Sequence, residues 1–332
     1  MDRLLRRCRI RSSLARECLA EGLGVYVMIL FGCGSVAQVT TSRDTKGEYL
    51  SINLGFALGT TFGVYIAKGI SGAHLNPAVS LSLCLLGRHP WTHLPFYLVS
   101  QFLGAFLAAA TVHLQYYDAI SSFGALEVTG PNGTAGIFAT YPADYLSLGA
   151  GVLDQVIGTA ALLVCVLAIG DQRNTPAPQG LEPVLVGAIV LVIGVSMGSN
   201  SGYAINPARD LGPRVYTYLA GWGAEVFSAG GSWWWVPVVA TPLGAVVGSL
   251  LYELLVGVHL PDSDTLADEL ILANHPALEL EGKCPDGEIP KPANPVNSQE
   301  WLERPTLGSA VCETAIKDAF PKCGGVHSLW GQ

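Results

Sequence analysis

The stretch Ser71–Ala78 reads SGAHLNPA, and nearly the same pattern returns as SGYAINPA at Ser201–Ala208. Each copy ends in the tripeptide Asn-Pro-Ala, at Asn76, Pro77 and Ala78 and again at Asn206, Pro207 and Ala208. Asn is a favoured helix N-cap, and Pro is favoured at the first helical position because its missing N–H would be unpaired there anyway. Each tripeptide therefore predicts the start of a helix.

The apolar segment at each tripeptide is too short to cross a membrane. The two segments are Leu75–Leu86 and Ile205–Leu219. A helix of about 11 residues, rising about 1.5 Å per residue, extends about 16 Å, roughly half of the 30 Å hydrocarbon core. We therefore expect two half-helices.

The composition predicts a membrane protein that crosses the bilayer several times. Of the 332 residues, 50% are hydrophobic and only 13% are charged, with a mean hydropathy of +0.40. Soluble proteins carry about 25% charged residues, so a soluble enzyme, a disordered protein and a nucleic-acid binder all fit poorly. Stretches without charge predict six spanning helices near 18–39, 49–68, 93–115, 150–170, 183–200 and 233–256.

The spans and short segments form a tandem repeat. Three spans and one short segment make up repeat one, about 18–115, and the same set makes up repeat two, about 150–257. An odd number of spans gives the two repeats opposite orientations, so the half-helices enter from opposite faces and their N-termini meet near the midplane. The expected fold is an all-α membrane protein with six transmembrane helices and two half-helices in an inverted 3+3 repeat.

The meeting point of the half-helices has the chemistry of a pore for neutral solutes. Backbone carbonyl acceptors are expected from Gly72, Ala73 and His74 and from Tyr203, Ala204 and Ile205. The two Asn side chains supply donors at the centre. Each helix N-terminus carries about half a positive charge, which repels cations and disfavours a proton wire.

The distribution of basic residues predicts the orientation in the membrane. Arginines crowd the chain before the first span, whereas the loop 118–149 contains no Lys or Arg. The positive-inside rule places the N-terminus in the cytoplasm, and six spans return the C-terminus to the same side. The loop 118–149 then faces outside, and its sequon Asn132-Gly133-Thr134 predicts glycosylation at Asn132.

Three regions follow from this layout. Residues 1–17 form an Arg-rich cytoplasmic N-terminus, and residues 18–257 form the channel domain. Residues 258–332 hold 12 acidic and 5 basic residues with no apolar run long enough to span, which is typical of a disordered cytoplasmic tail.

Together these features resemble the aquaporin superfamily, also called the major intrinsic proteins, over roughly residues 14–260. Finer similarity to the aquaglyceroporin branch, nearest to its aquaporin-3 type, lies in Ile70–Val79, Gly130–Pro142, Asn206–Arg214, Gly221–Gly223 and Trp233–Pro237. The resemblance implies a passive channel for water and glycerol, with urea and similar neutral solutes as lesser cargo. It also implies a homotetramer in the bilayer of the cell membrane, with no cofactor, metal or nucleic acid involved.

The resemblance also implies a selectivity filter near the outer mouth, formed by Phe56, Gly194, Tyr203 and Arg209. Arg209 is a fixed cation with five donors that can hold a solute hydroxyl while repelling cations. Phe56 and Tyr203 would offer an apolar corner to the carbon chain of a polyol. Strict water channels tend to carry His at the position of Gly194, and Gly is expected to leave room for a three-carbon solute.

Further positions carry roles that the resemblance alone implies. The glycerol-channel signature reads Tyr117, Asp210, Arg214, Pro242 and Leu243, with Tyr116 as the alternative to Tyr117. Glu21 is expected to brace loop backbone from behind the pore, with Gln155 or Asp154 as its partner in the second repeat. His74 either lines the cytoplasmic vestibule or is purely structural.

Three other functions compete with the water and glycerol channel. A strict water channel and an adhesion protein of the same fold with little conductance are two of them. A coupled transporter or membrane enzyme is the third. The sequence has no Walker-type Gly-Lys-Ser/Thr motif and no intramembrane acid pair suited to proton coupling, so we expect a channel and no enzymatic activity.

Overall fold

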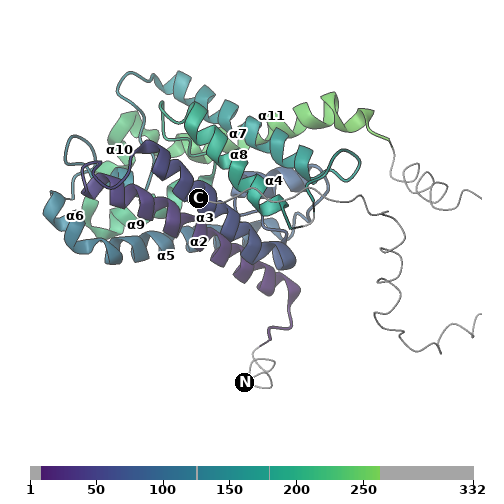
Figure 1. Cartoon of the computed structure of the whole chain (residues 1–332), viewed down its shortest axis with the longest axis horizontal. Helices are drawn as coiled ribbons and strands as arrows, with labels where there is room; N and C mark the ends of the chain where they lie inside the picture. The colour runs from purple at the N-terminus through teal and green to yellow at the C-terminus, as the bar shows by residue number, and fades with distance from the viewer. Residues whose placement is uncertain (1–8, 125, 179, 262–332) are drawn as a thin grey trace, which may run out of the picture. The chain divides into compact units, whose positions relative to one another are not determined.

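The computed structural model describes residues 9–124, 126–178 and 180–261. Its long apolar helices are α2 (Ser13–Thr41), α3 (Tyr49–Ser71), α5 (Leu94–Gln115), α7 (Leu148–Gly170), α8 (Glu182–Met197) and α11 (Val236–Leu255) (Figure 1). Two short helices, α4 (Pro77–Leu85) and α9 (Pro207–Thr217), begin at the Asn-Pro-Ala tripeptides. The predicted acidic tail lies outside the described residues from residue 262 onward, as does the start of the Arg-rich N-terminus, residues 1–8.

Shorter elements make up the connections. They are α6 (Tyr117–Phe123), η1 (Ala135–Ile137), η2 (Tyr218–Trp222), α10 (Glu225–Ser232), η3 (Trp233–Trp235) and η4 (Gly257–His259). The turn η3 separates α10 from α11, so the sixth long helix begins at Val236 and not at the predicted residue 233.

The helix lengths agree with a membrane protein. Five stretches of helix are long and apolar enough to cross a bilayer, and the last of them contains α11. The remaining long helix, α8, has 16 residues and extends about 24 Å. It ends at Met197, short of the predicted residue 200, because the chain turns at Gly198 into the loop that leads to the second tripeptide.

The packing follows the repeat. In the first repeat α2 packs on α3 and α5, and in the second α7 packs on α11 and α8, while α3 and α8 join the two repeats. Each half-helix, α4 or α9, contacts both α5 and α11. The last long helix of each repeat therefore supports both half-helices, as an inverted repeat requires.

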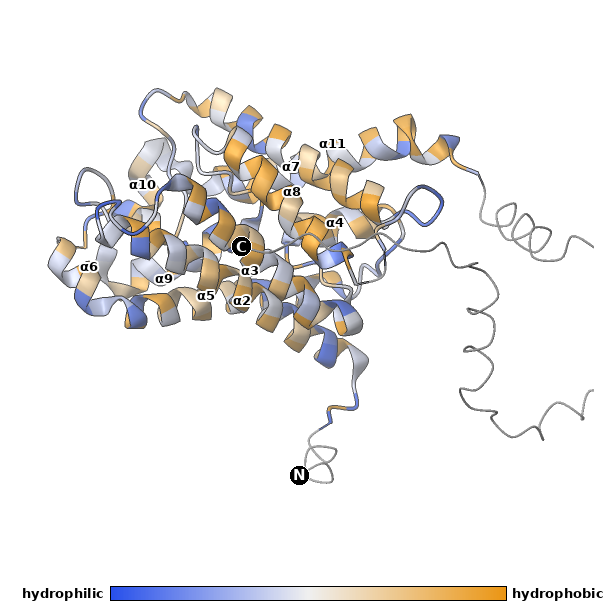
Figure 2. Ribbon diagram, in the orientation of Figure 1, coloured by the Kyte–Doolittle hydropathy of each residue, from blue (hydrophilic) through white to orange (hydrophobic). Residues whose placement is uncertain are grey.

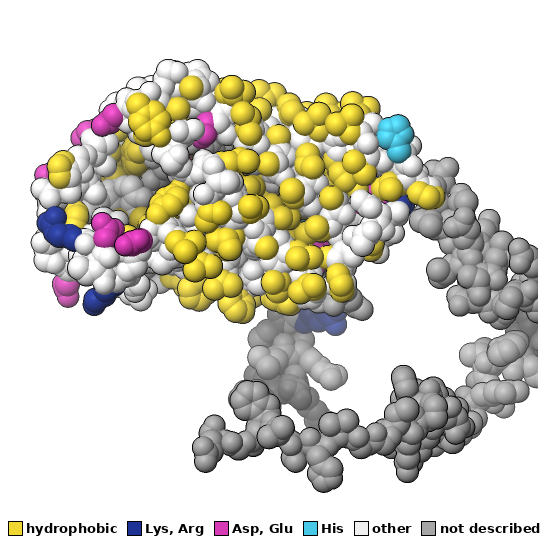
Figure 3. Space-filling view, turned by 45° about the horizontal axis from the view of Figure 1, so that its top comes forward, with side chains coloured by type: hydrophobic (Ala, Val, Ile, Leu, Met, Phe, Trp, Pro, Cys, Tyr) yellow, Lys and Arg dark blue, Asp and Glu magenta, His cyan; other side chains and the backbone are white. Residues whose placement is uncertain are grey.

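Large apolar side chains cover the outside of the long helices. Examples with about half or more of their surface exposed come from five helices: Leu19, Phe31, Leu58, Phe62, Leu103, Leu153 and Leu254. Hydrophobic residues dominate the long helices in Figure 2, and in Figure 3 they spread over the face in view while charged side chains are sparse. An apolar surface of this extent needs lipid or another apolar partner to cover it.

Glycines set the closest helix contacts. A Cβ atom added at Gly104 on α5 would overlap the carbonyl oxygen of Gly22 on α2. Likewise, one at Gly244 or Gly248 on α11 would overlap backbone carbonyls of α7. These small-residue faces of α5 and α11 are thus used for packing within the chain, where close backbone approach is favourable.

We expect Gly104→Ala to destabilise the protein by about 1–3 kcal/mol, because the new methyl group forces α2 and α5 apart. The measurement is the thermal unfolding midpoint of the detergent-solubilised protein. Gly34→Ala is the matched control, since a Cβ at this helical glycine meets nothing within 4 Å. Equal midpoints for the two variants would show that the α2–α5 contact is not tight.

Candidate functional site

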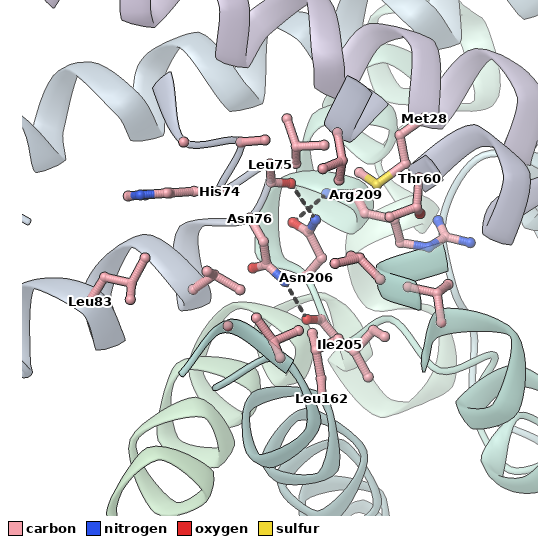
Figure 4. Close-up of a pocket in the computed structure, with 18 of the residues that line it drawn as sticks. Met28, Thr60, His74, Leu75, Asn76, Leu83, Leu162, Ile205, Asn206 and Arg209 are labelled. Atoms are coloured by element: carbon pink, nitrogen blue, oxygen red, sulfur yellow. Dashed lines mark hydrogen bonds between the residues drawn. The ribbon is translucent and has the colours of Figure 1, made fainter. Parts of the chain in front are cut away.

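A cavity of about 280 Å³ lies between the two matched loops. One face of α3 runs along the cavity. It contributes Phe56, Thr60, Val64 and Lys68, which are spaced four residues apart and so share that face. The wall also contains both loops and both capping asparagines: Gly72, Ala73, His74, Leu75, Asn76, Tyr203, Ala204, Ile205 and Asn206. The residues expected to expose pore carbonyls thus border one space (Figure 4).

The two asparagines cap their half-helices and also bridge the two repeats. Asn76 Oδ1 accepts from Ala78 N at 2.9 Å, and Asn206 Oδ1 accepts from Ala208 N at 2.9 Å. Asn76 Nδ2 donates to the carbonyl of Ile205 at 2.8 Å, and Asn206 Nδ2 donates to the carbonyl of Leu75 at 2.8 Å (Figure 4). An amide nitrogen carries two N–H groups, so each side chain keeps one donor for a solute.

Both loops hold the backbone in the left-handed region. In the first, φ is +57° at Ala73 and +53° at Leu75, and in the second it is +40° at Tyr203 and +44° at Ile205. Positive φ is unfavourable for residues with a Cβ and persists only where surrounding contacts enforce it. The sequence repeat is therefore also a repeat of strained backbone.

Glu21 braces the first loop from behind. Its side chain is fully buried, and its two oxygens accept hydrogen bonds from His74 N at 2.9 Å and Leu75 N at 2.7 Å. Two side chains complete the set: Ser71 Oγ donates at 2.6 Å and Gln101 Nε2 at 2.8 Å. A buried carboxylate with four donors is well satisfied and fixes the loop.

The second loop divides the same task between two residues. Gln155 Oε1 accepts from Ile205 N at 3.0 Å, so Gln155 touches the loop backbone directly. The carboxylate is on Asp154, which accepts from Ser201 Oγ at 2.5 Å and from Asn200 Nδ2 at 2.9 Å. Gln155 Nε2 also donates to Ser201 Oγ at 2.7 Å, which links the two halves of the brace. Both residues that the sequence left as alternatives therefore contribute.

Three of the four expected filter residues meet at one end of the cavity. The Phe56 and Tyr203 rings pack edge to face, with centroids 6.2 Å apart. The Arg209 guanidinium lies over Phe56 at 4.5 Å from the ring centroid and donates from Nη1 to the carbonyl of Phe138 at 3.0 Å. A guanidinium carries five donors, so this Arg209 bond leaves others for a solute.

Gly194 is the exception. It does not belong to the cavity wall, because the space beside it is already filled. A Cβ atom at Gly194 would lie 2.9 Å from Cζ of Tyr203 and 2.8 Å from Oδ1 of Asn53. The expectation that Gly194 directly leaves room for solute is corrected: its missing side chain makes room for Tyr203.

The signature residues Asp210 and Arg214 form a fully buried ion pair, with Nε to Oδ1 at 2.9 Å. Both bind the loop before α7 at Thr140: its N–H donates to Asp210 Oδ2 at 2.7 Å, and its carbonyl accepts from Arg214 Nη2 at 2.5 Å. The Arg214 guanidinium also stacks 4.6 Å from the ring centroid of Tyr141, whose pKa burial raises to about 12. This pair ties the loop before α7 to the second half-helix.

The other signature residues do not line the cavity. Tyr117 and Leu243 are exposed on the outside, and Pro242 lies inside α11. Tyr116 packs against the core instead. The structure thus gives Tyr117, Pro242 and Leu243 no contact with a solute path.

His74 lines the cavity at its other end and belongs to a cluster of aromatic rings with His89, His93 and Tyr97. His74 Nδ1 lies 3.0 Å from Ser80 Oγ, and its ring packs on His89 and Tyr97 with centroids 4.6 and 4.9 Å apart. Burial lowers the pKa of His89, and the nearby His93 adds to this effect. His74 borders the cavity as well as packing on its neighbours, so its place is not purely structural.

The predicted glycosylation sequon, Asn132-Gly133-Thr134, lies in the loop before α7. Asn132 is exposed, while Thr134 of the same sequon is fully buried and accepts a hydrogen bond from Trp222 Nε1 at 2.9 Å. Across the described ranges, no three His, Cys, Asp or Glu side chains come together in a way that could hold a metal ion.

The sequence reasoning missed several site residues. Gln101 binds Glu21, and Asn53 binds Tyr203, yet neither was singled out. A polar residue inside an apolar span was the available signal for both. Ser71 and Ser201 open the two matched stretches, and each binds the brace of its own repeat.

The sequence of the chain matches a known protein family and several of its members. A model of the major intrinsic protein family matches residues 9–252. Aquaporin-10 of Homo sapiens is 55% identical over 275 residues, covering 82% of this chain and 91% of that protein. Aquaporin-9 of Homo sapiens is 53% identical over 259 residues, covering 77% and 88%, respectively.

Two further matches agree with these. Aquaporin-7 of Mus musculus is 49% identical over 274 residues, covering 80% of this chain and 90% of that protein. Among solved structures, the aquaglyceroporin from Plasmodium falciparum superposes with a TM-score of 0.67 at 30% identity, covering 74% of this chain and 98% of that one.

The second loop is held by an amide on Gln155 and a carboxylate on Asp154, an arrangement called the divided brace below. This division predicts the effect of moving the carboxylate from one residue to the other. Gln155→Glu would place a second carboxylate beside Asp154, whose Oδ2 lies 3.5 Å from Gln155 Nε2. We expect a loss of about 1–3 kcal/mol of stability from this like-charge contact. The double variant Asp154→Asn/Gln155→Glu restores one carboxylate, now placed as Glu21 is, and should regain most of the loss. Thermal unfolding midpoints test this, and a double variant no better than Gln155→Glu would contradict the divided brace.

Proposed function

The chain belongs to the major intrinsic protein family, and from this premise we propose that it is a channel for water and glycerol that excludes ions and protons. The family is one of membrane channels, and the fold is the aquaporin fold expected from the inverted repeat. One observation carries the proposal. The two half-helix N-termini meet at a shared cavity, with one amide donor of each asparagine left for a solute.

The polar groups along the cavity suit a solute with several hydroxyl groups. The two loops supply carbonyl acceptors, the two asparagines supply donors, and Arg209 supplies further donors beside the aromatic rings. A glycerol molecule could therefore exchange hydrogen bonds along one side while its carbon chain contacts apolar wall. Urea can exchange hydrogen bonds with the same wall, because it carries N–H donors and a carbonyl acceptor.

The same elements oppose the passage of charge. The N-termini of α4 and α9 contribute partial positive charge at the centre, and Arg209 adds a full positive charge at the filter. We propose that Phe56, Tyr203 and Arg209 form the filter, with Gly194 acting from behind Tyr203. Glu21, Gln155 and Asp154 hold the loops in place.

Other features of the proposal concern the setting of the channel. We infer a location in the cell membrane with both termini in the cytoplasm, as the arginines before α2 favour. The outer loop then carries a glycan at Asn132. A homotetramer with one pore per subunit follows by analogy with the family.

Stopped-flow light scattering of proteoliposomes tests the proposed function. Under a sucrose gradient the vesicles should shrink faster than protein-free vesicles, and under a glycerol gradient they should also re-swell faster. Fast water flux with glycerol flux at the background level would identify a strict water channel. Water and glycerol fluxes that both stay at the rates of protein-free vesicles would favour a structural protein of the same fold.

Arg209→Val should raise proton permeability about ten-fold, which corresponds to about 1.4 kcal/mol of lost barrier, because the filter loses its fixed charge. A pH-sensitive dye inside the vesicles measures the leak under an imposed pH gradient. Arg11→Val is the control, since this exposed residue precedes α2 and lies outside the cavity wall. Equal proton leak in both variants would remove Arg209 from the charge barrier.

A further inference from the structure

The hydroxyl of the filter residue Tyr203 is bound to a residue that is not part of the cavity wall. Tyr203 Oη donates to Asn53 Oδ1 at 2.6 Å, joining the second loop to α3 across 150 residues of sequence. Asn53 is only 1% exposed. Its Nδ2 finds no hydrogen-bond partner in the part of the chain that the structure describes, so Tyr203 supplies its side chain's one recorded hydrogen bond.

A buried amide that makes a single hydrogen bond costs stability, because its other polar atom is desolvated without a partner. Asn53 lies one helical turn before Phe56 on α3, inside an otherwise apolar stretch. An apolar residue at this position would pack without leaving Nδ2 unpaired. The contact with Tyr203 is therefore the feature that distinguishes Asn53 from its apolar neighbours.

Gly194 on α8 and Gly198, the residue that follows this helix, complete the seat of the Tyr203 ring. A Cβ at Gly194 would lie 2.9 Å from Tyr203 Cζ, and one at Gly198, a turn later, would lie 2.8 Å from Tyr203 Cδ1. The ring thus lies directly against the backbone of α8. Asn53 holds the far end of the ring, because its Oδ1 accepts the phenolic hydrogen.

This seat determines what Tyr203 presents to a solute. The hydroxyl is engaged behind the wall, and the residue faces the cavity as part of an apolar corner with Phe56. The polar contacts of the filter are left to Arg209, which also contacts Phe56. A polyol needs this division, with hydroxyls toward the guanidinium and carbons toward the rings.

We propose that Asn53 is a specificity-determining residue, which keeps the Tyr203 ring seated against Gly194 and Gly198 so that the filter stays wide and apolar enough for glycerol. This inference rests on the proposed function, since it concerns the choice between glycerol and water. Asn53 acts through Tyr203 and is a positioning residue.

Replacing Asn53 has a defined physical consequence. In Asn53→Leu the buried Tyr203 hydroxyl loses its acceptor, and an unpaired buried hydroxyl is strongly unfavourable. We expect the hydroxyl to regain a partner by turning toward the cavity, where permeating water can accept its hydrogen bond. The ring then narrows the filter and makes it polar, which hinders glycerol more than water.

The test compares a single variant and a double variant by the ratio of glycerol to water permeability in proteoliposomes. We expect Asn53→Leu to lower this ratio about five-fold, and Asn53→Leu/Tyr203→Phe to restore it, because removing both partners of a buried bond is nearly neutral. Thr61→Val is the matched control, since Thr61 is also buried on α3 against α8 but its hydroxyl bonds within its own helix, to the carbonyl of Ala57. Its ratio should stay at the wild-type value.

The outcomes separate this inference from the proposed function. Wild-type protein without glycerol flux would refute the proposed function and this inference with it. Wild-type flux of both solutes with an unchanged ratio in Asn53→Leu would refute only the role of Asn53. A double variant as impaired as Asn53→Leu would also overturn it, because the effect would not pass through the hydroxyl. If Asn53→Leu does not fold, Asn53→Ser removes the same contact with a smaller side chain.

Discussion

The structure depends on a pair of reciprocal hydrogen bonds at its centre. Asn76 donates to the loop of the second repeat and Asn206 to the loop of the first, each at 2.8 Å. Because each asparagine also caps its own half-helix, the two bonds fix both helix starts relative to each other. The partial positive ends of α4 and α9 are thereby held at the shared cavity, where each opposes the entry of cations.

This arrangement requires strained loops, and the strain is offset from outside the pore. The carbonyl-exposing turns hold four residues with a Cβ at positive φ. In the first repeat the Glu21 carboxylate accepts hydrogen bonds from two loop N–H groups. In the second, the uncharged Gln155 accepts from one loop N–H group, and the carboxylate belongs to its neighbour Asp154. The repeats are thus related in backbone but differ in the position of the carboxylate, which is fully buried at Glu21 and half-buried at Asp154.

The sequence predicted the backbone of this channel better than its side-chain contacts. Two matched Asn-Pro-Ala stretches sufficed for the half-helices, because capping is local chemistry. The role of Gly194 could not be predicted, since it depends on Tyr203 and Asn53, which pair across 150 residues of sequence. The end of α8 was placed three residues too far because the stretch without charged residues continues past Met197 into the polar loop.

A density map of the channel in lipid nanodiscs soaked with glycerol tests the central claim most directly. The account predicts solute density between Asn76 and Asn206, within hydrogen-bond distance of their free amide hydrogens, and continuing past the two loops to Arg209 beside Phe56 and Tyr203. The cross-repeat bonds from both asparagines should persist in that map. Asparagine amides turned away from the cavity, or a path for solute elsewhere in the molecule, would contradict it.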